Sequence, residues 1–143
     1  MKYYSEAIEF FEQEIQHNPV IDHHIALAEA YLNTDDTSKA LPHLEKAIAT
    51  KDTDPTLRLS YANLLLHGER FSEAANHYLK LLEQTPNSVI AWNGLAFAMY
   101  KNDDLIGALN ALLKSAQAGT PKPAQVYLRA IIEDKLELRK EAL

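Results

Sequence analysis

Apolar residues recur along this chain with a spacing that is typical of amphipathic helices. An alanine in a constant apolar context recurs with a period of about 34 residues, at Ala7, Ala40, Ala74, Ala108 and Ala142. Four residues after each of the first four comes a large apolar residue, at Phe11, Leu44, Tyr78 and Leu112. A second alanine column precedes the later members of the first by a constant distance, at Ala28, Ala62, Ala96 and Ala130. Because residues four apart share one helix face, the pattern predicts a repeated helical unit.

Each copy of the unit contains two apolar stripes with a short break between them, which predicts a helical hairpin. Asp54-Pro55 places an N-cap before a proline at the first helical position. Gly68 and Asn102 are expected to be the left-handed residues that end first helices. At Pro42 we expect a slight bend of its helix and no break. Counting in register gives a single all-α domain with a half-repeat at 1–20, hairpins at 21–54, 55–88 and 89–122, and a terminal helix or partial repeat at 123–143.

The repeated pattern resembles the tetratricopeptide repeat, in which W-x2-L-G-x2-Y is followed by A-x3-F and then P. The third copy matches best, with Trp92, Leu95, Ala96, Met99, Ala108 and Leu112. The terminal copy departs from the pattern, because Arg129 and Glu133 stand where large apolar residues are usual. The resemblance covers essentially the whole chain. It implies a right-handed α-α superhelix of about three full hairpins plus flanking helices, whose first helices line a concave groove for protein partners.

Composition narrows the classes of partner. The net charge is −6, and 14 Lys and Arg are scattered among 20 Asp and Glu, so we expect no nucleic-acid partner. No apolar run approaches the roughly 18 residues of a membrane span, so we expect no membrane partner. The chain has no cysteine, which excludes thiolate chemistry and fits a reducing, cytoplasmic location.

The sequence contains no arrangement that predicts a catalytic site, a metal site or a cofactor. His23 and His24 are adjacent and therefore point about 100° apart on a helix, which is unsuitable for a helical zinc pair. His24 stands in the column of Trp92, and we interpret it as a packing residue. Asp35-Asp36 and Asp103-Asp104 fall at hairpin turns, where an aspartate caps the next helix. We therefore predict that the protein is not an enzyme.

The expected binding site is the concave groove, on the face of the first helices opposite the alanine column. The residues that register assigns to peptide binding are Ile25, Glu29, Leu59, Asn63, Leu66, Asn93, Phe97, Tyr100, Tyr127 and Ile131. The last groove position of the four copies is occupied by Asn33, His67, Lys101 and Lys135. Most of the assigned residues are apolar or aromatic, which a solvated wall would not need. A column of small residues, Ala26, Ser60 and Gly94, predicts a shallow trough along the groove floor.

These observations favour a non-catalytic scaffold that binds an apolar or amphipathic segment of a partner protein in its groove. The alternative is a structural spacer or oligomerisation module of a larger multidomain protein. RNA binding of the pentatricopeptide type is disfavoured by the length of the repeat period and by the acidic balance. Some family members grip a C-terminal carboxylate with Lys, Arg and Asn, and the corresponding positions here lack those residues.

The N-terminal helix carries a feature that other copies lack. Tyr3 and Phe10 lie seven residues apart and therefore on one helix face, and no other copy is aromatic at both positions. Terminal repeats need a polar outer face to stay soluble. We therefore predict a weak homodimer through exposed terminal helices, with Tyr3 and Phe10 in the contact.

Overall fold

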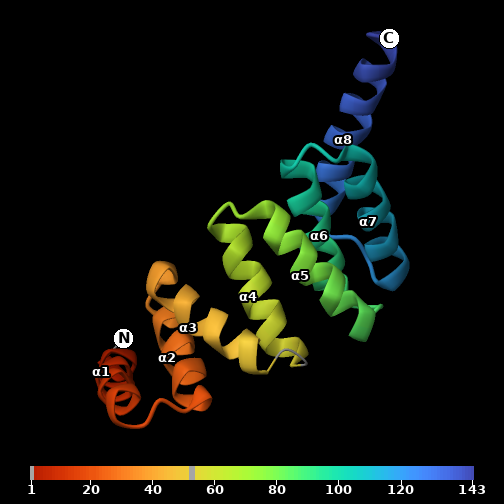
Figure 1. Cartoon of the computed structure of the whole chain (residues 1–143). Coiled ribbons are helices and arrows are strands. Elements are labelled where there is room, and N and C mark those ends of the chain that lie inside the picture. Colours follow the sequence, from red (N-terminus) through yellow and green to blue (C-terminus); the bar gives the residue numbers. More distant parts are fainter. Residues whose placement is uncertain (1, 52–53) are drawn as a thin grey trace. The chain divides into compact units, whose positions relative to one another are not determined.

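The chain consists of helices joined by short turns (Figure 1), in a computed structural model that describes residues 2–51 and 54–143. Within these residues there are eight α-helices and no strand, which confirms the all-α prediction. The helices are α1 (Lys2–His17), α2 (Ile21–Asn33), α3 (Thr37–Thr50), α4 (Pro55–His67), α5 (Phe71–Gln84), α6 (Val89–Lys101), α7 (Leu105–Ala118) and α8 (Pro123–Glu141).

The helix starts follow the period of the sequence repeat. The first helices and α8 begin at equally spaced positions, Ile21, Pro55, Val89 and Pro123. The second helices begin with the same spacing, at Thr37, Phe71 and Leu105. The segment from 123 onward, for which the sequence left a long helix or a partial hairpin open, is one helix as far as Glu141. The helix α3 continues through Pro42 without a break, as expected.

The left-handed residue of each hairpin turn lies one position later than the sequence suggested. The backbone angle φ is positive at Asp35 (59°), Glu69 (58°) and Asp103 (65°). Neither Gly68 nor Asn102 has a positive φ, so the prediction for these two residues is wrong. Asn and Asp tolerate the left-handed region better than most residues, which suits two of the three turns.

Hydrogen bonds at the end of α6 explain this position. The N–H of Asp103 donates to the carbonyl of Tyr100 at 3.1 Å, and the N–H of Asp104 donates to Met99 at 2.9 Å. These are the two bonds of a Schellman motif, which places the left-handed residue one position after the helix cap. The Asp104 carboxylate then accepts the N–H of Gly107 at 2.9 Å and begins α7, as predicted.

Other predicted caps are also present. The Asp36 carboxylate accepts the N–H of Lys39 at the start of α3. The Asp54 carboxylate accepts the N–H of Thr56 at 2.9 Å, at the start of α4. Each cap satisfies a backbone donor that has no partner within its own helix. Side-chain caps therefore begin α3, α4 and α7, whereas Arg70 at the start of α5 makes no such hydrogen bond.

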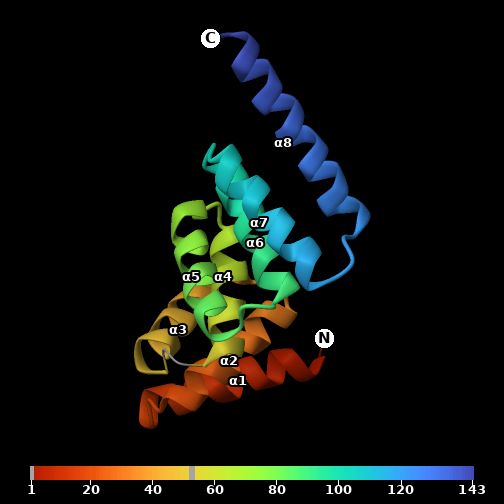
Figure 2. The ribbon, with the colours of Figure 1, turned by 90° about the vertical axis from the view of Figure 1, so that its right-hand side faces the viewer.

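Backbone contacts divide the chain into two compact units, residues 1–64 and 65–143, and each is described by itself. In the first unit α1 packs on α2, and α2 packs on α3 (Figure 1). In the second unit α5 packs on α6, α6 on α7, and α7 on α8 (Figure 2). The last turns of α8 extend past the ends of α6 and α7 in both views. A single domain from 1 to 143 stays a prediction.

Most residues of the alanine columns lie in the core. Six of these residues are completely buried: Ala28, Ala40, Ala62, Ala74, Ala96 and Ala108. A small side chain lets two helix backbones approach each other, so a larger residue would overpack these positions. Ala130, on α8, is exposed.

Candidate functional site

An open groove of about 330 Å³ lies among α6, α7 and α8 of the second unit. Its walls contain five of the ten residues that the sequence assigned to peptide binding: Asn93, Phe97, Tyr100, Tyr127 and Ile131. The remaining lining consists of Leu112, Ala124, Gln125 and Leu128. Three consecutive helical elements of the repeat therefore build one mainly apolar groove.

Aromatic side chains dominate the exposed part of the groove. Tyr127 is 71% exposed and Phe97 is 38% exposed, whereas Tyr100 and Ile131 are half-buried. A cluster of solvent-exposed aromatic and aliphatic side chains in a concave surface is typical of a binding site. The half-buried residues fix the walls, and the exposed rings provide surface that a ligand can cover.

Asn93 supplies a polar group to the groove, and a hydrogen bond from α7 fixes its orientation. The hydroxyl of buried Ser115, on α7, donates to Oδ1 of Asn93 at 2.7 Å. In the described part of the chain this is the only hydrogen bond of the Asn93 side chain. Its amide nitrogen is consequently free to donate to a backbone carbonyl of a bound segment.

Two lysines lie over aromatic rings of the groove. The ammonium of Lys135, on α8, is 4.9 Å from the ring centroid of Tyr100. The ammonium of Lys101, at the end of α6, is 5.8 Å from the ring of Phe97 and 5.6 Å from that of Phe71. These distances are within the range of cation–π attraction. Sequence reasoning placed both lysines at groove positions but did not select them, because ring contacts of long side chains depend on side-chain torsions.

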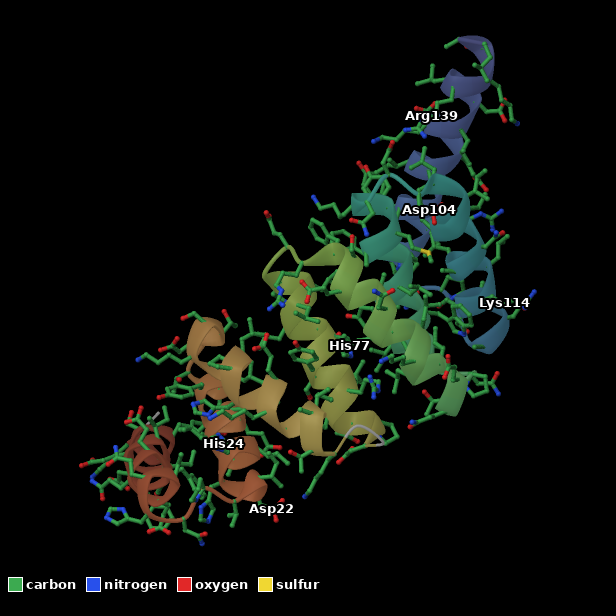
Figure 3. The ribbon with its side chains drawn as sticks, in the orientation of Figure 1. Asp22, His24, His77, Asp104, Lys114 and Arg139 are labelled. Atoms are coloured by element: carbon green, nitrogen blue, oxygen red, sulfur yellow. The ribbon has the colours of Figure 1, made fainter. Side chains whose placement is uncertain are left out.

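An ion pair joins the end of α8 to the turn between α6 and α7. Nη2 of Arg139 lies 2.6 Å and 2.8 Å from the two carboxylate oxygens of Asp103. Figure 3 shows Arg139 on α8 and the neighbouring Asp104 at the start of α7. The Arg139 guanidinium lowers the pKa of Asp103, by hydrogen bonding and by charge. Asp103 therefore stays ionised and is already paired.

The other five assigned residues do not line this groove. Ile25 and Glu29, on α2, line a hollow of about 80 Å³ in the first unit, together with Leu44 and Ser60. The remaining three, Leu59, Asn63 and Leu66, are half-buried on α4 and line neither hollow. Peptide binding by these five residues stays a prediction.

Gly94 has a structural reason to be small. A Cβ atom at this position would lie 2.5 Å from Cε1 and 2.6 Å from the hydroxyl oxygen of Tyr78, and closer still to Cζ. Tyr78 belongs to α5 and is completely buried, and burial raises the pKa of its hydroxyl to about 12. The glycine thus accommodates a buried ring of the preceding helix, and it does not line the groove. This packing replaces the trough that the sequence suggested at Gly94.

Comparison with known proteins agrees with this architecture. The sequence of residues 35–96 matches the family described as tetratricopeptide repeat. This part of the chain is therefore similar in sequence to tetratricopeptide repeats. No curated protein matches the chain in sequence.

Solved structures of low sequence identity share the fold. MamA 41-end from Desulfovibrio magneticus RS-1 has a TM-score of 0.84 and 14% identity, over 97% of this chain and 79% of that chain. MamA AMB-1 has a TM-score of 0.85 and 17% identity, over 99% and 78%. YrrB, described as a TPR protein with an unusual peptide-binding site, has a TM-score of 0.81 and 19% identity, over 90% and 67%. The chain thus shares the helical solenoid fold of these proteins, as predicted.

The repeat register also explains two buried polar side chains. His24, Arg58 and Trp92 stand at one repeat position in successive copies, and His24 and Arg58 are buried. Burial of His24 agrees with its interpretation as a packing residue. The burial of Arg58 was not predicted, since arginine is rarely buried and the column gave no hint of its partners.

His24 contacts a second histidine. Its Nδ1 lies 2.8 Å from Nδ1 of His43, on α3, and the ring of Tyr31 stacks on His43 with centroids 6.0 Å apart. One Nδ1–H donates to the other Nδ1, so the bond requires that one ring carry no proton there. Burial lowers the pKa of both histidines. Among the residues described, no group of three or more His, Asp or Glu is placed to hold a metal.

The two aromatic residues assigned to self-association lie in the open on α1. Tyr3 is 83% exposed and Phe10 is 56% exposed. The ring of Phe10 makes an edge contact with Phe11 at 5.2 Å, which leaves most of its surface in solvent. Self-association through this face of the repeat array stays a prediction. In the part of the chain that the structure covers, no helix has both the length and the apolar character of a membrane span.

Proposed function

We propose that this chain is a non-catalytic scaffold that binds an apolar or amphipathic segment of a partner protein in the groove of α6, α7 and α8. The observation that carries the proposal is the exposed aromatic wall of Phe97 and Tyr127 beside the oriented amide of Asn93. Apolar side chains of the segment would cover the rings, and a backbone carbonyl would accept from Asn93. Tetratricopeptide repeat proteins act generally as scaffolds for protein–protein interaction, which supports this class of function.

The chemistry of the groove supports binding and not catalysis. Its lining consists of aliphatic and aromatic side chains with the amides of Asn93 and Gln125. A general acid or base that works near neutral pH needs a histidine, a carboxylate or a similar group within hydrogen-bond reach of its substrate. Among the described residues, the groove lining contains no histidine and no carboxylate, and the hydroxyls of Tyr100 and Tyr127 are its only groups of this kind. YrrB, a TPR protein with an unusual peptide-binding site, is a parallel for the proposed mode.

The proposal is tested by selecting peptides and then mapping where they bind. A displayed library of random 16-residue peptides is selected on the chain, and the affinity of each selected peptide is measured by fluorescence polarisation. Truncation of a central aromatic residue in an interface commonly costs about 2 kcal/mol, or roughly thirtyfold in affinity. We therefore expect Phe97→Ala with Tyr127→Ala to weaken binding by at least that factor.

A matched control separates the groove from exposed apolar surface in general. Leu79 and Ile106, in α5 and α7, are 43% and 66% exposed and lie outside the groove. Leu79→Ala with Ile106→Ala should leave the affinity within twofold of the parent. Peptides that bind the groove variant as tightly as the parent would refute the proposed site.

The alternative function, a spacer or oligomerisation module, is favoured by one observation, the exposed pair Tyr3 and Phe10 on α1. A library selection that yields no peptide, combined with concentration-dependent self-association of the chain, would support this alternative.

A further inference from the structure

Lys101 and Lys135 occupy the same repeat position in two copies, on α6 and α8. Each lies one helical turn beyond a groove residue of its own helix, Phe97 and Ile131. The equivalent position on α2 is the neutral Asn33. Each lysine therefore lies beside a ring that lines the groove of the second unit, and neither lysine is part of the lining.

The rings of the groove hold these cations in place. Tyr100 lines the groove and lies 4.9 Å from the ammonium of Lys135, and Phe97 lines the groove and lies 5.8 Å from that of Lys101. A cation over a ring face loses rotational freedom before a ligand arrives. A ligand that covers the rings also comes within reach of both ammonium groups.

The positive charge at this end is not neutralised within the unit. Throughout residues 2–51 and 54–143, no carboxylate lies within ion-pair distance of either ammonium. Asp103, near Lys135, is already paired with Arg139 at 2.6 Å. Within the part of the chain that the structure describes, Lys101 and Lys135 thus carry ammonium groups without an ion-pair partner, although Asp134 is the sequence neighbour of Lys135 and Asp104 that of Asp103.

We propose that the partner segment is acidic: one apolar side chain fills the groove, and the carboxylate of an Asp or Glu in the same segment binds Lys101 and Lys135. This inference rests on the proposed function and adds the chemistry of the partner. Charge complementarity selects this occupant, because a carboxylate forms short, charge-assisted hydrogen bonds with ammonium groups. It also selects against basic segments, which two fixed cations repel.

The test uses displayed random 12-residue peptides with amidated C-termini, so that any carboxylate recognised is that of a side chain. We expect peptides selected on the parent to be enriched in Asp or Glu near a Leu, Ile or Phe. The best peptide is then synthesised with its acidic residue as Glu, Gln or Lys. The Gln form should bind the parent at least fivefold more weakly, and the Lys form more weakly still.

Charge reversal gives the decisive comparison. The variant Lys101→Glu with Lys135→Glu should lose the Glu peptide and bind the Lys peptide more tightly than the parent does. The variant Lys101→Met with Lys135→Met, which keeps apolar stems, should bind the Glu and Gln peptides equally. The control, Lys80→Glu with Lys114→Glu, makes the same change in net charge on α5 and α7 (Lys114 in Figure 3), and should bind as the parent does.

Each outcome has a definite meaning. Peptides that depend on Phe97 and Tyr127 but tolerate Glu→Gln within twofold would overturn the acidic inference and leave the groove function standing. Equal losses of affinity in the two charge-reversal variants would show general charge steering and would also overturn the acidic inference.

Peptides whose affinity does not depend on Phe97 and Tyr127 would overturn the proposed function and the inference together. Self-association of the chain that the selected peptide abolishes would identify a second copy as the occupant and overturn the partner assignment.

Discussion

The contact between Tyr78 and Gly94 gives a quantitative test of the packing. Substitution of Gly94 by alanine would place Cβ 2.5 Å from Cε1 of Tyr78, whereas ordinary van der Waals contact begins near 3.4 Å. Tyr78 is completely buried, so its ring has little space in which to move. In the first unit the equivalent residues are Leu44 and Ser60, which line one hollow together. Where the preceding helix carries the smaller Leu44 in place of Tyr78, the position of Gly94 is thus occupied by the larger Ser60.

The expected magnitude follows from two opposing effects. Overpacking of this size costs about 1–3 kcal/mol of unfolding free energy. Replacement of a helical glycine by alanine stabilises the folded state by about 1 kcal/mol. Gly94→Ala alone should thus destabilise the protein by up to about 2 kcal/mol. In a Tyr78→Leu background the clash is absent, and the same substitution should stabilise the protein by up to about 1 kcal/mol.

The assay is urea unfolding of the parent, the two single variants and the double variant, followed by circular dichroism at 222 nm. The coupling free energy should be about 1–3 kcal/mol in favour of the double variant. Tyr78→Phe is the control, because it keeps the ring atoms that clash and should leave Gly94→Ala destabilising. A coupling below about 0.5 kcal/mol would refute the packing argument, since independent sites behave in that way.

Three further predictions concern the caps, the histidine pair and α1. Asp104→Ala removes the cap of α7 and should reduce the unfolding free energy by about 1 kcal/mol in the same urea assay. Burial lowers the pKa of His24 and His43 in the folded state below the ordinary 6.5, so the unfolded chain binds more protons than the folded chain. The free energy of unfolding should therefore be highest above pH 6.5 and should fall as the pH drops below this value. His24→Trp with His43→Ala, the pair that the third repeat carries, should abolish that loss in melting curves at pH 7.5 and 5; an unchanged loss would exclude the histidines as its source. In sedimentation at high micromolar concentration the parent should associate weakly and Tyr3→Glu with Phe10→Lys should not; a monomeric parent would end the self-association hypothesis.

The positions of the helices could be predicted because the signals are local. The repeat period, the caps Asp36, Asp54 and Asp104, and the alanine columns each act within a few residues. The left-handed residue was misplaced because residue preference favours glycine or asparagine, whereas the two bonds of the Schellman motif determine which position must adopt it. Glu69 shows that these bonds prevail over preference.

The site could be predicted only where repeat register alone determines the surface. Register placed Phe97, Tyr127 and three other residues on one groove, because first helices repeat with the same orientation. Register could not reveal that Gly94 makes room for Tyr78, since that depends on one ring in a neighbouring helix. It also could not reveal the ring contacts of the lysines, because flexible side chains choose among many torsions of similar energy.

The two faces of α8 differ in the charges that a packed partner would bury. The residues at the positions of Trp92, Leu95, Ala96 and Met99 are Val126, Arg129, Ala130 and Glu133. Arg129 and Glu133 pair with each other at 2.8 Å, so a helix packed on this face would bury an ion pair at considerable cost. The substitution of apolar residues by a pair of charges is the expected way to keep an outer repeat face soluble. On the opposite face of the same helix, Tyr127 remains 71% exposed without any such substitution. A partner that covers the face of Tyr127 would meet no such ion pair, whereas a partner that covers the face of Val126, which is 57% exposed, would have to bury it.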